Sequence, residues 1–258
     1  MTVRNSFVSV DSMRHFISNI IAGVIWKKSL RDKVRTMIRF PQTHIYTRFV
    51  RGLARDGKKC KIKTVVGYGC KNWIVILNNK RVFKFPLLTD GQEIALREKR
   101  ITDTFSKISP IKIPAMKIIN FNGVYVREYK FATGKLLTDV PPQTILQNSM
   151  HIAKQLANFL YVIGQSDPKE LRDLKPESSA KPGYMYGWFQ GDIWQNFMLD
   201  EKTFDITYFL DWEGTNFEDF RTSLRIASHN WDKFGYKGII VDVIAEYSKL
   251  YMSSKNKK

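Results

Sequence analysis

The chain has 258 residues, of which 43% are hydrophobic, and it carries a formal net charge of +18. This length is enough to bury a full core, and this apolar content excludes a generally disordered chain. The two cysteines, Cys60 and Cys70, lack metal-ligand spacing and are too few for a disulfide scaffold. The sequence contains no run of about 20 apolar residues and no secretory signal, so we expect a protein of the reducing cytoplasm.

The positive charge is concentrated near the beginning of the chain. Residues 1–63 contain 15 Lys and Arg but only three acids, a net of +12, whereas residues 64–258 contribute +6. A bias of this size predicts an anionic surface as partner, either a membrane or a nucleic acid. Nucleic acid is the weaker interpretation, because the aromatic residues of this region form no stacking motif of a known RNA-binding module.

Residues 13–40 combine this charge with helical periodicity. Apolar residues recur at helical spacing from Phe16 to Trp26, and beyond Trp26 lysines and arginines alternate with apolar residues. The pattern predicts a basic amphipathic helix that lies on an anionic membrane surface, since its apolar stretch is too short to span a bilayer. The alternative is a helix whose apolar face packs on the protein while its cations are merely solvated.

From residue 61 onward the pattern changes to short β-strands. Three strands are predicted, over residues 61–66, 73–77 and 81–85. A Gly-x-Gly turn, Gly67 to Gly69, separates the first two strands, and Asn78-Asn79 makes a tight turn before the third. The third strand is apolar except for one central lysine, Lys84.

The next segments predict one helix, two further strands and then a mainly helical part. The helix is expected over residues 90–108 and carries the acids Glu93 and Glu98. The remaining elements are two strands in 111–138 around an Asn122-Gly123 turn, a long helix after Pro141-Pro142, a polar loop at 165–187 and two helices beyond Gly214.

Residues 188–214, WFQGDIWQNFMLDEKTFDITYFLDWEG, concentrate side chains suited to a metal ion. Two short β-prone runs, FML and ITYFL, flank a polar turn, so the segment predicts a hairpin. The hairpin would return Asp211 close to Asp192 and Asn196. Two carboxylates and a carboxamide are hard oxygen ligands of the kind that Mg²⁺ takes when it is shared with substrate phosphates.

The segment also resembles a known family. QGDIWQNFML followed by YFLDWE is similar to the H-G-D-x-x-x-x-N and I-D-W-E motifs of the aminoglycoside phosphotransferase and choline kinase-like enzymes, which share the protein-kinase-like fold. The resemblance implies that Asp192 orients or deprotonates the acceptor hydroxyl, and that Asn196 and Asp211 hold Mg²⁺. Two departures are present: Gln190 stands where the family has His, and Asn196 follows Asp192 by four residues where the family has five.

The resemblance extends to the segments before this motif. It implies that the hairpin with Gly67 and Gly69 covers the phosphates of ATP, and that Lys84 holds the α- and β-phosphates. LREKRITDTF is similar to the family's helix in which a glutamate, here Glu98 with Glu93 as the fallback, pairs with that lysine. VYVREYKFATG is similar to the hinge, where backbone groups near Glu128 and Tyr129 would meet adenine.

The predicted fold class is therefore α+β, a protein-kinase-like two-lobed fold with a small β-rich N-lobe and a mainly helical C-lobe. The expected divisions are a basic amphipathic leader at 1–60, the N-lobe at 61–130, the C-lobe at 131–252 and a tail at 253–258. In this family the C-terminal helices help to form the acceptor pocket. Glu213, Glu218 and Asp219 are candidates to meet the acceptor there.

The function implied is an ATP- and Mg²⁺-dependent phosphotransferase that phosphorylates a hydroxyl. The basic leader is weakly similar to that of some bacterial surface-polysaccharide enzymes, which favours a lipopolysaccharide or other lipid-linked sugar as acceptor and a peripheral position on the inner face of a membrane. A small-molecule kinase for choline, an amino alcohol or an aminoglycoside is the alternative. A non-catalytic kinase-like module, suggested by Gln190 and the short loop, is a third interpretation.

Overall fold

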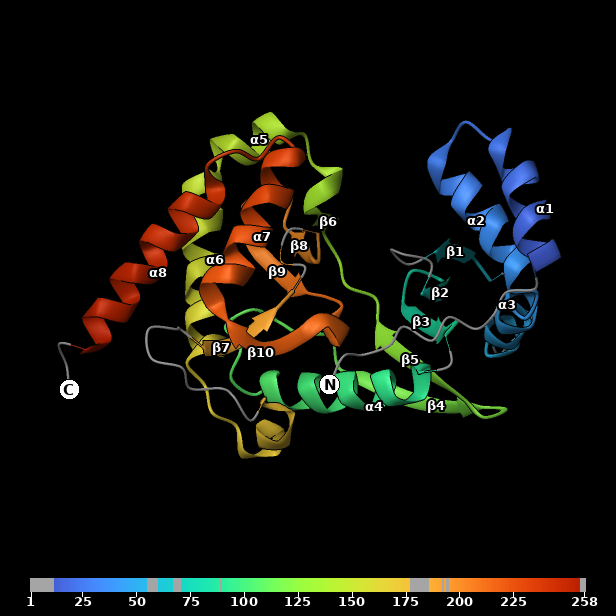
Figure 1. Cartoon of the computed structure of the whole chain (residues 1–258), viewed down its shortest axis with the longest axis horizontal. Coiled ribbons are helices and arrows are strands. Elements are labelled where there is room, and N and C mark those ends of the chain that lie inside the picture. The colour runs from blue at the N-terminus through green and yellow to red at the C-terminus, as the bar shows by residue number, and fades with distance from the viewer. Residues whose placement is uncertain are drawn as a thin grey trace. The chain divides into compact units, whose positions relative to one another are not determined.

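The computed structural model describes residues 12–54, 60–66, 71–88, 90–176, 186–191, 193 and 195–255 (Figure 1). The chain forms two compact units. The N-terminal unit comprises Met1–Lys99 and Met116–Phe131, and the C-terminal unit comprises Arg100–Ala115 and Ala132–Lys258. Among the described helices, none combines the length and the apolar character that crossing a membrane requires.

The N-terminal unit begins with three helices, α1 (Ser12–Gly23), α2 (Lys28–Arg39) and α3 (Thr43–Gly52). The single amphipathic helix expected over 13–40 is therefore wrong. The chain leaves the helix after Gly23, a residue of low helix propensity, and re-enters it at Lys28. The break lets α1 and α2 lie side by side, and Arg39 donates hydrogen bonds to Ser18 and Asn19, each at 2.9 Å.

A five-stranded antiparallel sheet follows, in the order β1-β2-β3-β5-β4. Its strands are β1 (Ile62–Val66), β2 (Asn72–Leu77), β3 (Arg81–Pro86), β4 (Met116–Phe121) and β5 (Val124–Lys130). All five predicted strands are confirmed. The strands could be predicted because residues typical of tight turns separate them. Asn78 and Asn79 have φ of 54° and 50°, and Asn122 and Gly123 have φ of 50° and 82°. Such paired positive φ values form the turns that suit two-residue hairpins.

The core of this unit lies between the sheet and α3. Trp73, Phe83 and Phe85 are buried together with Phe40 and Tyr46, which come from the basic leader. Tyr46 stacks on Phe85 with ring centroids 4.5 Å apart. The end of the leader is thus part of the hydrophobic core of the sheet, whereas the beginning of the leader is not.

Helix α4 (Gly91–Phe105) confirms the helix predicted over 90–108. Its buried positions, Ala95, Glu98, Ile101, Thr102 and Phe105, recur at helical spacing and define one face. The division between the two units falls within this helix, after Lys99. Glu98 therefore belongs to the N-terminal unit.

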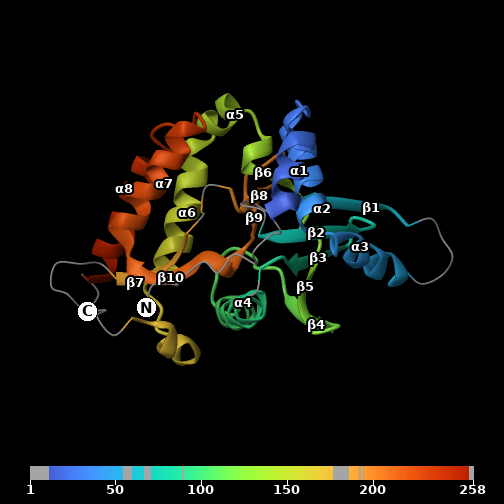
Figure 2. The same ribbon diagram turned by 45° about the vertical axis from the view of Figure 1, so that its right-hand side comes forward.

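The C-terminal unit is mainly helical. Its helices are α5 (Pro142–Gln147), α6 (Ser149–Gly164), α7 (Phe220–Lys233) and α8 (Ile239–Lys255). The single long helix expected after Pro141-Pro142 is interrupted at Asn148, whose side chain donates to the carbonyl of Thr144 at 2.9 Å. Helix α8 packs against α6 and α7, as Figures 1 and 2 show. The helices α7 and α8 confirm the two helices expected beyond Gly214.

Five short strands complete the C-terminal unit: β6 (Lys135–Leu136), β7 (Tyr186–Gln190), β8 (Phe197–Leu199), β9 (Ile206–Phe209) and β10 (Thr215–Asp219). They form a three-stranded sheet, β6-β8-β9, and a two-stranded sheet, β10-β7. The unit also contains three 3₁₀ turns, Leu137–Asp139, Lys169–Leu174 and Trp212–Gly214. The turn at Lys169–Leu174 lies within the predicted loop at 165–187, and Arg100 is paired with Asp173 at its end.

Candidate active site

Lys84 and Glu98 form the ion pair that the sequence predicted. Lys84 lies in the middle of β3, and its Nζ is 3.8 Å from a carboxylate oxygen of Glu98 on α4. Both side chains are buried, and the carboxylate of Glu98 is fully so. Glu93, the fallback partner, is exposed on another face of the helix. A buried carboxylate persists as an ion only where cations or donors compensate its lost hydration.

A second cation makes the closer contact with Glu98. The guanidinium of Arg127, on β5, lies 2.6 Å from the Glu98 carboxylate and is itself buried. Tyr129 Oη donates to the other carboxylate oxygen at 3.0 Å, and Arg127 also donates to the side-chain oxygen of Asn72 on β2. Glu98 is therefore the centre of a network that joins α4 to three strands of the sheet.

Sequence reasoning missed Arg127, although a signal was present. Arg127 lies directly opposite Lys84 in the β3-β5 register. In the sequence it is a charged residue in the middle of the strand VYVREYK, where it is buried. An arginine at a central position of a central strand needs a buried carboxylate as partner, and Glu98 provides it.

Glu128 and Tyr129 do not lie where a hinge would present backbone groups. Both are inside β5, which is paired with β3 on one side and with β4 on the other. Their backbone groups are used by the sheet, and the Glu128 side chain is paired with Arg81 at 2.6 Å. The contact of backbone groups near these residues with adenine therefore stays a prediction. The chain leaves the sheet only after Phe131, whose amide still donates to the carbonyl of Lys80.

Three predicted site residues lie outside the described residues. They are Gly67 and Gly69 of the Gly-x-Gly turn and the predicted catalytic residue Asp192. The strands that flank the turn, β1 and β2, are paired over their whole length. The residues next to Asp192, Gly191 and Ile193, are described, and Ile193 is buried in the core of the C-terminal unit.

The hairpin predicted between the two β-prone runs is confirmed as β8 and β9. Phe197 is opposite Phe209, and the amide of Leu210 donates to the carbonyl of Asn196 at 2.6 Å. Asn196 is therefore directly opposite the residue that precedes Asp211. Although the loop from residue 192 is one residue shorter than in the resembling family, the ladder brings Asn196 next to Asp211.

Asp211 is held in an unusual backbone conformation. Its φ of 54° and ψ of 73° fall in the left-handed region, which Asp and Asn tolerate better than most residues. Gln190, the residue in place of the family's histidine, donates from Nε2 to the carbonyl of Asp211 at 2.7 Å and is buried. Gln190 thus supplies a hydrogen bond that fixes the strained residue.

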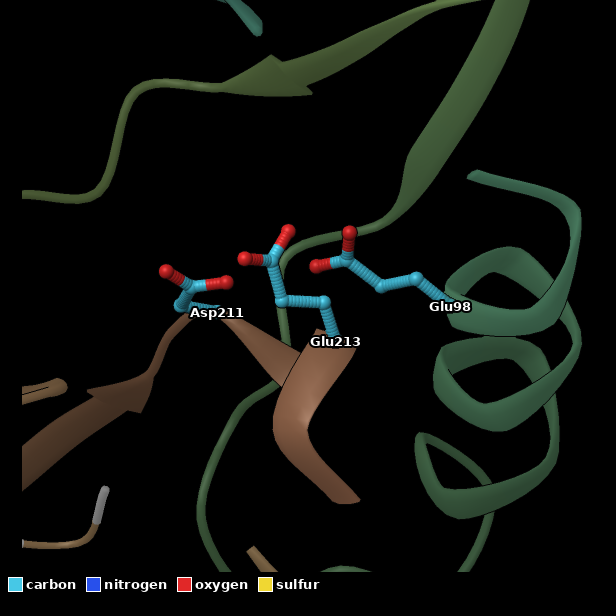
Figure 3. A group of neighbouring side chains, drawn as sticks. All are labelled: Glu98, Asp211 and Glu213. Carbon is cyan, nitrogen blue, oxygen red and sulfur yellow. The ribbon is translucent and has the colours of Figure 1, made fainter. Parts of the chain in front are cut away.

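Glu213 lies beside Asp211 in the same turn, as Figure 3 shows. A carboxylate oxygen of Glu213 is within 4.8 Å of one of Asp211. Sequence reasoning assigned Glu213 to the acceptor, but the turn places it with the metal-binding candidates. Figure 3 also labels Glu98, which comes from α4 of the other unit.

Trp212 anchors this turn in the core of the C-terminal unit. Its indole Nε1 donates to the carbonyl of Phe209 at 3.1 Å, and its ring contacts Phe105, Phe159 and Phe209. Phe159 of α6 stacks on Phe209 with centroids 4.5 Å apart. The D-W-E sequence therefore places a buried aromatic residue between two carboxylates and keeps the carboxylates in a fixed turn.

The tip of the β8-β9 hairpin is held by two carboxylates. Asp200 accepts from the amides of Lys202 and Thr203 at 2.8 and 3.0 Å, and these bonds lower the pKa of Asp200. Hydrogen bonds from the Thr203 hydroxyl and then from His151 lower the pKa of Asp205. Both acids therefore favour the ionised form in the folded hairpin.

Glu218 and Asp219, the other acceptor candidates, have structural partners. Asp219 caps α7 by accepting from the amide of Arg221 at 3.3 Å. Glu218 accepts from the Ser223 hydroxyl at 2.5 Å. Both acids therefore accept hydrogen bonds from the first turn of α7. Their contact with an acceptor stays a prediction.

Comparison with solved structures identifies the fold. The GDP complex of wild-type aminoglycoside 2′-phosphotransferase-IIIa superposes with a TM-score of 0.62 at 15% identity, covering 80% of this chain and 83% of that one. Macrolide 2′-phosphotransferase from Brachybacterium faecium gives 0.56 at 13% identity, covering 80% and 82%. The fold is that of the kinase-like phosphotransferases.

A third similar structure is the ternary complex of streptomycin, ATP and APH(2″)-IIa, with a TM-score of 0.57 at 12% identity, covering 80% of this chain and 83% of that one. No family model matches the sequence, and no curated protein matches it. The structural similarity therefore confirms the predicted α+β kinase-like fold, with a β-sheet N-terminal unit and a helical C-terminal unit. At sequence identities this low, the similarity shows the fold and nothing further.

Proposed function

We propose that this protein is an ATP- and Mg²⁺-dependent phosphotransferase that transfers the γ-phosphate of ATP to a hydroxyl group. The observation that carries the proposal is the buried Lys84-Glu98 pair, 3.8 Å apart, on a strand and the following helix of a kinase-like fold. In that fold a strand lysine held by a helix glutamate neutralises phosphate oxygens. The similar structures contain GDP, ADP or ATP, which supports nucleotide binding.

The residues have separate tasks in this proposal. Lys84 places a positive charge against the α- and β-phosphates, where charge must be held during transfer. Glu98 and Arg127 keep that lysine in one orientation. Asp192 accepts or steers the proton of the acceptor hydroxyl, a positioning role in a loose transition state. Gly67 and Gly69 allow the backbone to approach the phosphates closely.

The turn after β9 has the donors that Mg²⁺ requires. Asp211 and Glu213 offer neighbouring carboxylates, and the ladder places Asn196 beside Asp211. These are hard oxygen ligands that suit Mg²⁺, which binds few protein carboxylates and completes its shell with water and phosphate. Bound there, Mg²⁺ would neutralise phosphate charge. Gln190 keeps the Asp211 backbone in the geometry that aims the carboxylate.

For the acceptor we favour a lipopolysaccharide or other lipid-linked surface sugar. The support is the net charge of +12 in residues 1–63, which a kinase for a small soluble acceptor does not need. On this proposal the protein is cytoplasmic and peripheral at the inner face of a bacterial membrane. The second candidate is a small-molecule acceptor, because the similar structures include aminoglycoside and macrolide phosphotransferases.

Transfer of labelled phosphate tests the reaction class. The purified protein is incubated with Mg²⁺ and γ-labelled ATP or GTP, together with a lipid-linked glycan, an aminoglycoside or a macrolide. We expect Mg²⁺-dependent label on a hydroxyl acceptor and its loss in Asp192→Asn, which keeps the shape but removes the charge. Transfer by Asp192→Asn at the wild-type rate, or no transfer to any acceptor, would contradict the proposal.

A non-catalytic kinase-like module is distinguished by the same protein preparations. A ligand that binds only the folded state raises the melting temperature. An enzyme should show stabilisation by Mg·ATP that is weakened in Lys84→Met, together with phosphate transfer. Stabilisation without transfer to any acceptor class would support a module that binds nucleotide only.

A further inference from the structure

Helix α1 exposes the large apolar side chains that a helix normally buries. Seven residues from Met13 to Trp26 are exposed, with Trp26 98% and Phe16 67% accessible. The others are Met13, Ile17, Ile20, Ile21 and Val24. Positions 13, 16, 17, 20 and 21 of α1, with position 24 directly after it, follow helical spacing and form one stripe, which we call the α1 stripe.

The side of α1 that contacts the protein carries small residues instead. Ser18 and Ala22 are buried, and Ser18 is held by Arg39 from the end of α2. Helix α1 lies beside α2 (Figure 1) and packs on it through its small residues, while its large apolar residues are exposed. For α1, this exposure contradicts the alternative in which the apolar face packs on the N-terminal unit.

Positive charge surrounds the α1 stripe. Residues 12–39 contain seven lysines and arginines and one acid, Asp32. Lys27 and Lys28 directly follow Trp26 and are exposed, as is Arg14 at the beginning of α1. The single acid is paired with Arg35, so it offers little repulsion to an anionic surface.

We propose that the α1 stripe inserts into the interface of an anionic lipid bilayer. An apolar helical face flanked by cations is the composition of helices that lie in the membrane plane, with the apolar face at the acyl boundary and the cations among the headgroups. Tryptophan prefers this interface, which suits the exposed Trp26 two residues beyond the stripe. The inference stands apart from phosphate transfer, because it rests on the described helices of the leader alone.

A bilayer fits this surface better than a nucleic acid. Phosphate backbones attract the cations but give no partner to a stripe of Met, Phe, Ile and Val. A bilayer accepts the stripe in hydrocarbon and the cations in anionic headgroups at the same time. The occupant is therefore identified by the combination of apolar face and charge.

The test is sedimentation of the full-length protein with lipid vesicles, without nucleotide. Vesicles of phosphatidylcholine with phosphatidylglycerol are compared with phosphatidylcholine alone. We expect binding to the anionic vesicles and a loss of roughly tenfold or more in the double variant Phe16→Ser, Ile20→Ser, because two inserted apolar side chains are removed. The matched control is Ile226→Ser, Val241→Ser on α7 and α8.

The control matches the test in chemistry and exposure. Phe16 and Ile20 are 67% and 57% accessible, and Val241 and Ile226 are 65% and 54%. Both double variants replace exposed apolar residues of a helix by neutral serine, so equal melting temperatures should confirm that both fold. A charge variant, Lys27→Gln with Lys28→Gln, should reduce binding to anionic vesicles and leave the weaker binding to neutral vesicles unchanged.

Trp26 provides a second readout. The other described tryptophans, Trp73, Trp188, Trp212 and Trp231, are at most 2% accessible. A blue shift of emission on adding anionic vesicles should therefore disappear in Trp26→Phe, which keeps an apolar ring.

Three results would overturn the inference. The first is no binding of the wild type to anionic vesicles. The second is undiminished binding of Phe16→Ser, Ile20→Ser, which would make the attachment purely electrostatic. The third is a lipid-free dimer that this variant converts to a monomer, since the stripe would then be covered by a second copy of the chain.

Discussion

At the scale of single residues, Glu98 brings a negative charge into the interior of the N-terminal unit and meets two cations there. Arg127 makes the short contact and Lys84 the long one, 2.6 against 3.8 Å. Arg127 and the Tyr129 hydroxyl donate hydrogen bonds to the two different carboxylate oxygens of Glu98. In the proposed function, Lys84 is the cation of this network that meets the phosphates.

Replacing Arg127 should therefore weaken both stability and nucleotide binding. Arg127→Met removes the main partner of a buried carboxylate and should lower the free energy of unfolding by about 3 kcal/mol. The matched control is Arg81→Met in the neighbouring strand, whose pair with Glu128 is partly exposed and should contribute about 1 kcal/mol or less. Urea unfolding measures both. Equal losses in the free energy of unfolding would show that the buried pair stabilises the protein no more than the partly exposed one.

The hydrogen bond from Gln190 to the Asp211 carbonyl should contribute to both stability and activity. Gln190→Leu removes the donor to the Asp211 carbonyl and should lower the free energy of unfolding by about 1–3 kcal/mol. Because Asp211 would lose the bond that fixes its left-handed backbone, we expect phosphate transfer to fall at saturating substrate. Gln190→His, which restores a ring donor, should recover most activity. A Gln190→Leu enzyme with wild-type turnover would show that this bond does not position Asp211.

At the scale of elements, the sequence predicted the strands whose partners are neighbours along the chain. The strands next to tight Asn-containing turns and the β8-β9 hairpin were predicted, because neighbouring residues set their pairing. Strands β7 and β10 were not, since Gln190 pairs with Thr215 across an intervening hairpin. Arg127 was missed for the same reason, because its partner Glu98 comes from another element.

The hairpin that carries Asp211 should be sensitive to acid. The folded-state pKa values of Asp200 and Asp205 are lowered, so their contribution to stability is present above the ordinary aspartate pKa and is lost as pH falls below it. Melting temperatures measured across this acid range should therefore fall less steeply in Asp200→Asn, Asp205→Asn than in the wild type. Parallel curves would mean that the turn does not contribute to acid stability.

At the scale of the whole molecule, the leader has two parts with different roles. The α1 stripe is exposed, whereas Phe40, Tyr46 and Val50 are buried in the core of the sheet. Composition revealed the charge of the leader. It could not reveal that the apolar face of α1 points outward, because hydrophobic periodicity is the same for a face that packs on protein and one that packs on lipid.

Two truncations should separate these roles. Removing residues 1–26 should abolish vesicle binding and leave the melting temperature nearly unchanged, since the described residues among them, 12–26, contribute none of the residues of the core cluster of the sheet. Removing residues 1–52 deletes three buried side chains, each worth about 2–5 kcal/mol, and should unfold the N-terminal unit. Circular dichroism and sedimentation measure both effects. A stable, folded 1–52 truncation would show that the leader is an appendage throughout.

The central claim is that Lys84 and Asp211 serve a nucleotide, and calorimetric titration of ATP tests it most directly. We expect the wild type to bind ATP more tightly with Mg²⁺ than without it. Lys84→Met should weaken binding by at least about tenfold, the loss of roughly 1.4 kcal/mol. Asp211→Asn, which retains the tolerated backbone conformation, should remove the Mg²⁺ dependence. Binding of ATP that is equally tight in Lys84→Met, or no binding by the wild type at millimolar ATP, would contradict the account.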